Sequence, residues 1–154
     1  MSNYSKGVIS IPEVTGDIVI TVTTEGQAIN LFDPSTATYN ARIRGTGEMV
    51  TGANGILVTA PINIADISTL TISGITEVLS TGYNYYAYIW TYSDADATTM
   101  VNRKGYTTEP TYIMDVGSIK QAAPTGVYCR VVLVLKNNEA ISAEDTANLT
   151  IYGS

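Results

Sequence analysis

Short segments in which hydrophobic and polar residues alternate recur along the chain, separated by glycine, asparagine and proline. In residues 17–23, Ile18, Ile20 and Val22 fall on one face of a strand at period two. Such segments recur roughly every 8 to 15 residues, a spacing typical of sandwiches and jelly rolls and not of alternating strands and helices. We therefore predict an all-β jelly-roll or β-sandwich fold of about eight strands, preceded by a short N-terminal β stem.

The clearest strand patterns lie in the larger, C-terminal part of the chain. The predicted strands are residues 40–44, 55–60, 69–73, 83–92, 111–116, 127–136 and 146–152. Residues 64–68 and 142–146 are the best helix candidates, each of about one turn. The segments 45–47 and 52–55 are predicted turns. The residues expected in the core are Ile18, Ile20, Leu57, Ile72, Ile89, Val132, Val134 and Leu149.

The N-terminal residues 1–27 form the predicted stem, and residues 28–154 form the main domain, with a junction at Gly26 and Gln27. A stem this short has too little chain around its apolar strand to cover it. An uncovered strand edge is an aggregation hazard, so we expect the stem to pair with a neighbouring subunit or another protein. The candidate assembly residues are Ile9, Ile11, Ile18, Ile20 and Val22.

The charge of the chain argues against two classes of partner. The formal net charge is -6, which disfavours binding to nucleic acid or insertion at an anionic membrane surface. Arg103 and Lys104 form the one adjacent basic pair, in the segment 102–105, whose turn residues predict an exposed hairpin tip. The N-terminus lacks the apolar core of a signal peptide, and no apolar run approaches the ~18 residues of a membrane span. These features indicate a protein made in a cytoplasm.

Residue types that commonly carry catalysis are scarce. The chain has no histidine, which removes the usual general base, metal ligand and activator of a nucleophile. Cys129, the single cysteine, lies in an apolar strand and is predicted to be a buried structural thiol. Asp94 and Asp96 could pair with Glu109 or Asp115, but the composition of residues 93–96 favours a turn, with a calcium site as the alternative. We predict a protein without enzymatic activity, cofactor or dedicated metal site.

Residues 83–92 contain five of the eleven tyrosines and the single tryptophan. In a strand, Tyr86, Tyr88, Trp90 and Tyr92 share one face, and Tyr83, Tyr85, Ala87 and Ile89 share the other. One face must belong to the core. The other face is either an aromatic core with subunit contacts or an exposed platform on which sugar rings stack. On the second interpretation the glycan-binding residues are Tyr86, Tyr88, Trp90 and Tyr92.

Several short motifs resemble the jelly-roll domains attached to bacteriophage tail and baseplate proteins. The first are Asn30-Leu31-Phe32-Asp33-Pro34-Ser35, Asn40-Ala41-Arg42-Ile43 and the hairpin at residues 52–55. Residues 9–22 are similar to the short β segment that precedes such domains, and residues 92–94 and 124–131 to later strands of the family. The likeness spans most of the chain.

The resemblance implies a carbohydrate-binding-like domain on a virion surface, synthesised in the cytoplasm of a host bacterium and forming a homotrimer. Its expected partners are other capsid or tail proteins and cell-surface glycans. In larger phage proteins the domain is joined to long fibre segments, whereas here a short stem precedes it. The alternative is therefore a capsid decoration or head-fibre protein docked by its N-terminal segment. The family's motif positions at Asp33, Arg42 and Arg130 serve either folding or binding.

Overall fold

The computed structural model describes residues 3–5, 8–10, 29–75, 87–106, 112–136 and 138–154. Near the N-terminus, β1 (Asn3–Ser5) and β2 (Val8–Ser10) pair as an antiparallel hairpin. Of the predicted stem residues, Ile9 lies in β2, while Ile11, Ile18, Ile20 and Val22 lie outside the described residues.

A six-stranded sheet occupies the middle of the main body. Its strand order is β10-β9-β12-β6-β3, and β7 also pairs with β12. The bounds are β3 (Thr38–Tyr39), β6 (Ile56–Val58), β7 (Ile62–Asn63), β9 (Ala87–Tyr92), β10 (Met100–Tyr106) and β12 (Tyr128–Val134). The strand β10 lies at one end of this order, with β9 as its neighbour.

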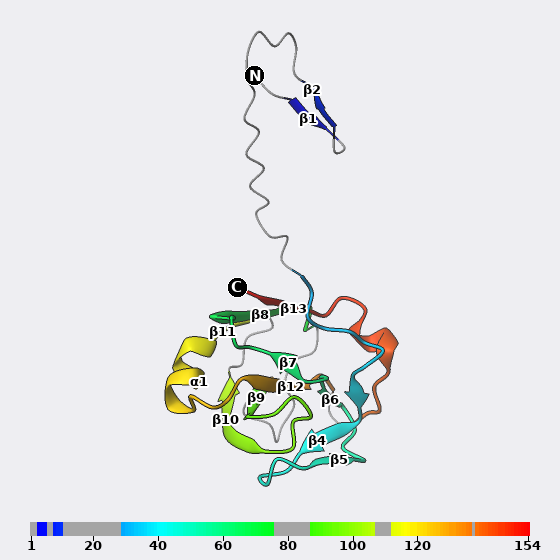
Figure 1. The fold of residues 1–154 in the computed structure, drawn as a ribbon. Coiled ribbons are helices and arrows are strands. Elements are labelled where there is room, and N and C mark those ends of the chain that lie inside the picture. The colour runs from blue at the N-terminus through cyan, green and yellow to red at the C-terminus, as the bar shows by residue number, and fades with distance from the viewer. Residues whose placement is uncertain (1–2, 6–7, 11–28, 76–86, 107–111, 137) are drawn as a thin grey trace.

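Two smaller β layers lie on opposite sides of the middle sheet (Figure 1). One is a three-stranded sheet in the order β11-β8-β13, and the other is the antiparallel hairpin β4-β5. Their bounds are β4 (Ala41–Ile43), β5 (Met49–Thr51), β8 (Thr69–Ser73), β11 (Tyr112–Asp115) and β13 (Thr150–Gly153). The predicted all-β sandwich is therefore confirmed, with more strands than the eight expected.

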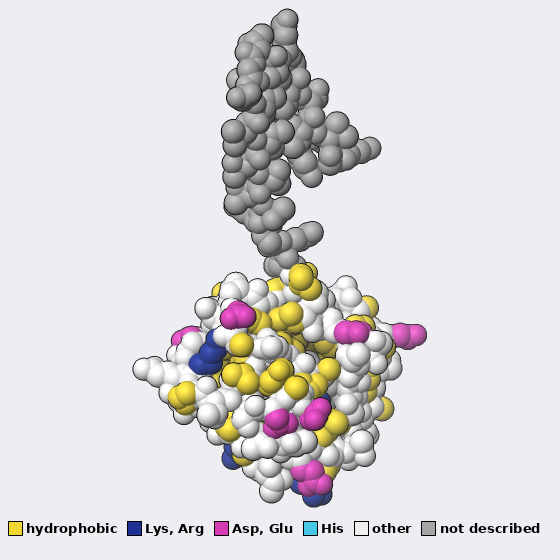
Figure 2. Space-filling view, in the orientation of Figure 1, with side chains coloured by type: hydrophobic (Ala, Val, Ile, Leu, Met, Phe, Trp, Pro, Cys, Tyr) yellow, Lys and Arg dark blue, Asp and Glu magenta, His cyan; other side chains and the backbone are white. Residues whose placement is uncertain are grey.

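The middle sheet has a hydrophobic cluster on each face. The larger cluster joins Ile72 of β8 and Ile151 of β13 to Leu57, Ile89 and Leu133 of the middle sheet. Figure 2 shows hydrophobic side chains gathered in the middle of the visible face, where these sheets meet, with acidic side chains around them. The smaller cluster lies under the hairpin β4-β5 and contains Ala41, Ile43, Ile56, Val58, Trp90, Tyr92, Ala97, Val132 and Val134.

Burial agrees with the predicted core wherever the structure describes it. Six of the expected residues are at most 5% exposed, namely Leu57, Ile72, Ile89, Val132, Val134 and Leu149. Full burial of a side chain of this size stabilises the folded state by about 1.5–3 kcal/mol, so these residues contribute much of its stability. The other two, Ile18 and Ile20, lie outside the described residues.

The helices differ from the sequence expectation. Residues 64–68 form a turn and not a helix, whereas a short 3-10 helix, η1 (Ala143–Thr146), confirms the second candidate. The helix α1 (Val116–Ala122) was not predicted. Its N-cap is Asp115, whose carboxylate accepts a hydrogen bond from the Ser118 amide at 3.1 Å. The helix has seven residues, which make too few turns for a recognisable 3.6-residue period. The hydrophobic pattern of the sequence therefore did not predict it.

Candidate ligand-binding site

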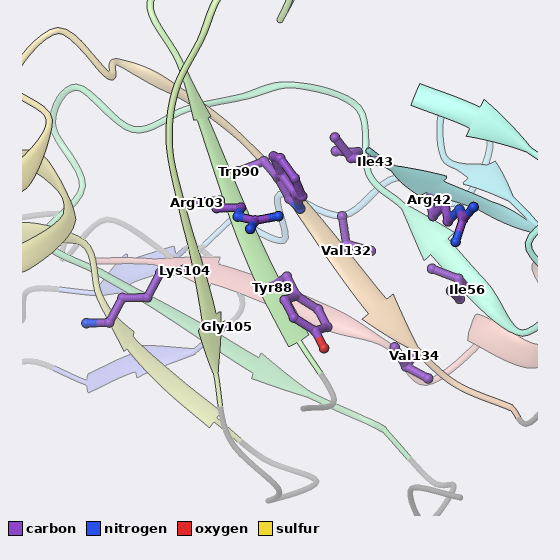
Figure 3. Close-up of a pocket in the computed structure, with 10 residues that line it drawn as sticks. All are labelled: Arg42, Ile43, Ile56, Tyr88, Trp90, Arg103, Lys104, Gly105, Val132 and Val134. Atoms are coloured by element: carbon purple, nitrogen blue, oxygen red, sulfur yellow. The ribbon is translucent and has the colours of Figure 1, made fainter. Parts of the chain in front are cut away.

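A pocket of about 420 Å³ lies on the face of the middle sheet that carries the hairpin β4-β5 (Figure 3). We call it the aromatic pocket. Its lining residues are Arg42, Ile43, Ile56, Tyr88, Trp90, Arg103, Lys104, Gly105, Val132 and Val134. The volume falls in the range of about 300–1,000 Å³ that is common for small-molecule sites.

The strand order explains how the aromatic pocket is built. Tyr88 and Trp90 come from β9, Val132 and Val134 from β12, and Ile56 from β6, which are consecutive strands. The pocket therefore has an apolar floor that crosses three strands. Figure 3 shows Arg103 beside Trp90 on one side of Val132, and Arg42 beside Ile56 on the other.

A glycine leaves one end of this face open. Tyr88 of β9 has a cross-strand partner on each side. These partners are Gly105 of β10 and Val132 of β12. Directly opposed residues of antiparallel strands share a face, so any side chain at position 105 would stand next to the Tyr88 ring. Because glycine has none, the space beside Tyr88 belongs to the pocket.

Arg103 is held over an aromatic ring. It is the cross-strand partner of Trp90, and its guanidinium carbon lies 5.4 Å from the centroid of the Trp90 ring. This is a cation–π contact, which orients the guanidinium group without neutralising its charge. Arg130 of β12 is the cross-strand partner of Trp90 on its other side. Its guanidinium group donates a hydrogen bond of 2.9 Å to the Thr59 carbonyl.

The prediction that residues 102–105 form a hairpin tip is wrong. These residues lie within β10, paired along their length with β9. The polar composition suggested a turn, but an edge strand tolerates charged residues, which discourage pairing with other molecules. Figure 3 shows the Lys104 side chain directed away from Tyr88 and Trp90, as expected for the residue after Arg103 in a strand.

The proposed aromatic platform is only partly available to a ligand. Tyr92 is fully buried and Trp90 is 5% exposed, because the hairpin β4-β5 covers this end of β9. The Tyr92 hydroxyl donates a hydrogen bond of 3.3 Å to the Gly47 carbonyl, and burial raises the pKa of this phenol. An exposed platform that includes Tyr92 is therefore wrong. Tyr88 is half-buried and lines the pocket together with Trp90, and Tyr86 lies outside the described residues.

A second pocket adjoins the aromatic pocket at Arg42, which lines both. We call it the polar pocket, and its volume is about 510 Å³. Its lining residues are Arg42, Arg44, Val50, Thr51, Gly52, Ala53, Asn54 and Asn138. Arg42 can serve both pockets because it is exposed between Ala41 and Ile43, whose side chains turn into the core.

Two of the four carboxylates considered for catalysis or calcium binding, Asp94 and Asp115, have structural partners. Both oxygens of Asp94 accept hydrogen bonds from the loop, at 2.9 Å from the Thr98 amide and 2.7 Å from the Thr99 amide. These bonds lower the pKa of Asp94 and confirm the predicted turn between β9 and β10. Asp115 caps α1, and Glu109 lies outside the described residues.

Cys129 and the two remaining motif positions serve the fold. Cys129 is fully buried in β12, and burial raises the pKa of its thiol to about 12. The thiol therefore stays protonated near neutral pH, which confirms the predicted structural role. Asp33 accepts a hydrogen bond of 2.8 Å from the Ser35 amide, so it stabilises a turn, and Arg130 holds the Thr59 carbonyl.

The described part of the chain contains no cluster of three or more His, Cys, Asp and Glu side chains suited to a metal ion. It also contains no helix with the length and apolar character needed to span a membrane. Comparisons of the chain with protein-family models, with curated proteins and with solved structures found no significant match.

Proposed function

We propose that this protein is a non-enzymatic bacteriophage virion protein that binds host or environmental glycans through the aromatic pocket. The observation that carries the proposal is the combination of a half-buried tyrosine, an apolar floor and two arginines in one pocket of about 420 Å³. Sugar rings present apolar C–H faces together with hydroxyl groups, and amphipathic aromatic side chains beside hydrogen-bond donors match both.

The composition of the pocket supports binding without hydrolysis. Among the described residues that line it there is no aspartate, glutamate or histidine. A glycosidase needs a pair of carboxyl groups on either side of the scissile bond. A pocket whose polar side chains are those of arginine, lysine and tyrosine can hold a glycan, but its described lining lacks that pair.

The virion context is supported by the sequence motifs that resemble phage jelly-roll domains. An adhesive protein of this kind needs little affinity at each site, because many copies on one particle turn weak contacts into useful avidity. Single-site dissociation constants in the millimolar range would be sufficient.

The first test is glycan binding by the full-length protein and by Tyr88→Ala. We expect binding to a subset of bacterial surface glycans on an array, with the affinity of Tyr88→Ala about tenfold lower because the stacking ring is lost. Tyr152→Ala is the matched control, since Tyr152 is also half-buried but lies in β13 of the other sheet. Absence of binding to every glycan at millimolar concentration would contradict the proposal.

A second variant distinguishes a blocked pocket from an unfolded protein as the cause of lost binding. Gly105→Val places a β-branched side chain beside Tyr88 in an edge strand, where such residues are favourable. We expect it to fill the pocket and abolish binding while the circular dichroism spectrum and thermal midpoint stay close to those of the parent protein. Unchanged glycan affinity in Gly105→Val would show that the ligand binds elsewhere.

Antibody labelling of phage particles in the electron microscope tests the virion part of the proposal. Labelling at the tail tip, with infection blocked by the free protein, supports adhesion. Labelling over the head without glycan binding supports the capsid-decoration alternative instead.

A further inference from the structure

The two pockets differ in charge from the rest of the molecule. The chain has a net charge of -6 and eight lysines and arginines in all. Four of those eight, Arg42, Arg44, Arg103 and Lys104, line the two pockets, and the described lining residues include no carboxylate. Clustering of positive charge on an acidic protein indicates a ligand that is itself negative.

Two of these arginines are available to such a ligand. Arg44 already has a counter-ion, because its guanidinium lies 3.4 Å from the Glu48 carboxylate. In the described part of the chain, no carboxylate lies within salt-bridge distance of Arg42 or Arg103. Their charges therefore remain to be balanced by salt, by parts of the chain outside the described residues or by a bound anion.

The guanidinium group of Arg103 is oriented for binding a planar anion. The Trp90 ring beneath its guanidinium group restricts the orientation of the fork of N–H donors. A fork of this kind matches the two oxygens of a carboxylate, with two parallel charge-assisted hydrogen bonds. Arg103 is exposed, so an anion from solution can reach its guanidinium group.

Arg42 connects the two pockets and sets a minimum size for the ligand. It lies across the floor from Arg103, on the opposite side of Val132 (Figure 3). From β10 to β6, whose Ile56 lies beside Arg42 of β4 in Figure 3, there are three inter-strand spacings, or about 14 Å. Beyond Arg42, the polar pocket offers Thr51, Asn54 and Asn138, which suit the hydroxyl groups of a further sugar residue.

From this arrangement we infer that the ligand is an acidic oligosaccharide. A carboxylated sugar residue occupies the aromatic pocket with its carboxylate on Arg103, and the chain continues past Arg42 into the polar pocket. The inference rests on the proposed glycan binding and specifies its substrate class.

The experiment compares one polymer in two charge states. The full-length protein is titrated with polyuronate oligomers, of galacturonic acid for example, and with the same oligomers after reduction of their carboxyl groups. We expect the reduced form to bind at least about tenfold more weakly, because a charge-assisted hydrogen bond is lost. We also expect the affinity for the acidic form to fall as salt is raised.

Variants of the two arginines test the assigned contacts. Arg103→Gln is expected to weaken binding of the acidic oligomer about tenfold, and Arg103→Lys to restore part of the loss, because lysine keeps the charge without the fork. Arg42→Gln, at an exposed position, keeps the test valid if Arg103→Gln fails to fold. Lys120→Gln is the control, since it removes one charge from α1.

The outcomes separate this inference from the proposed function. Equal affinity for the acidic and reduced oligomers, or an unchanged affinity in both arginine variants, would overturn the acidic ligand and leave glycan binding intact. Binding of poly-glutamate as tight as that of the polyuronate would overturn selection of a sugar. Failure of every glycan, charged or neutral, would overturn both.

Discussion

Single carboxylates organise the loops of this protein. Asp33, Asp94, Asp115 and Asp145 each accept hydrogen bonds from a backbone amide or hydroxyl within five residues. These bonds stabilise the charged form, and the pKa of each carboxyl group is lowered from its ordinary value of 3.8. Asp145 gains further from Lys136, whose ammonium group lies 2.6 Å from one carboxylate oxygen. The acidic composition thus has a local structural use besides its contribution to net charge.

We expect the thermal midpoint to fall as the pH is lowered below about 4. A carboxyl group with a lowered pKa in the folded state stabilises the fold above its unfolded pKa of about 3.8, and that contribution is lost as the pH falls through the folded value. Asp94→Asn should lower the midpoint at neutral pH by a few degrees and reduce its change between neutral and acidic pH. Asp96→Asn, in the same loop, is the control. Calorimetry that shows identical pH profiles for both variants would contradict this role of Asp94.

At the scale of elements, the middle sheet departs from simple alternation because both of its faces are covered. In β6 every residue is buried, and in β12 only Tyr128 and Arg130 remain partly exposed. Strands covered on both faces have continuous hydrophobic sequences, whereas a single covered face gives period two. The aromatic pocket arises where the short hairpin β4-β5 stops covering this sheet.

The turn between β5 and β6 allows a matched pair of substitutions. Gly52 and Gly55 both have positive φ, at 84° and 80°. A Cβ at Gly55 would lie 2.0 Å from the Lys136 carbonyl oxygen, whereas a Cβ at Gly52 would meet nothing within 4 Å. Gly52→Ala should cost about 1 kcal/mol of unfolding free energy from conformation alone, and Gly55→Ala about 3 kcal/mol or more.

Urea denaturation measures both values. Gly55 also joins β6 to β12, since its carbonyl accepts a hydrogen bond of 2.8 Å from the Leu135 amide. Any shift that relieves the clash disturbs this contact as well. Equal destabilisation by the two substitutions would show that the close approach to Lys136 does not constrain the turn.

For the whole molecule, the sequence predicts assembly through the N-terminal stem. On this prediction the apolar residues at 18, 20 and 22 form a strand that needs a covering partner, and the resemblance to phage domains suggests threefold symmetry. A pocket repeated three times on one particle component would also multiply weak glycan contacts.

Light scattering on the full-length protein tests this expectation. We expect a mass three times the 16.4 kDa of the chain at micromolar concentration. Ile18→Asp combined with Ile20→Asp should reduce the mass to that of a monomer, because charges disfavour burial of the strand. A monomeric parent protein under these conditions would contradict the homotrimer.

The amino-acid sequence by itself determined the fold class, most strand positions and the core. Leu57, Ile72 and Ile89 could be assigned to the interior from hydrophobic periodicity, and the turn at 93–96 from its composition, because both depend on neighbours along the chain. The strand at residues 100–106 and the helix α1 were not predicted, because prediction from the sequence uses these local patterns alone. The first resembles a loop in composition, and the second is too short for a period.

Only the tertiary structure decided which face of the aromatic strand is covered and where a ligand has room. Trp90 is buried by residues of β4, and Arg42 and Arg103 line one pocket although they are distant in sequence. Contacts between residues that are distant in sequence depend on strand order and register, which place residues of separate strands side by side. Local patterns carry no information about these partners. The open space beside Tyr88 likewise exists because register places Gly105 opposite it, a pairing that no alternation of residues along the chain could indicate.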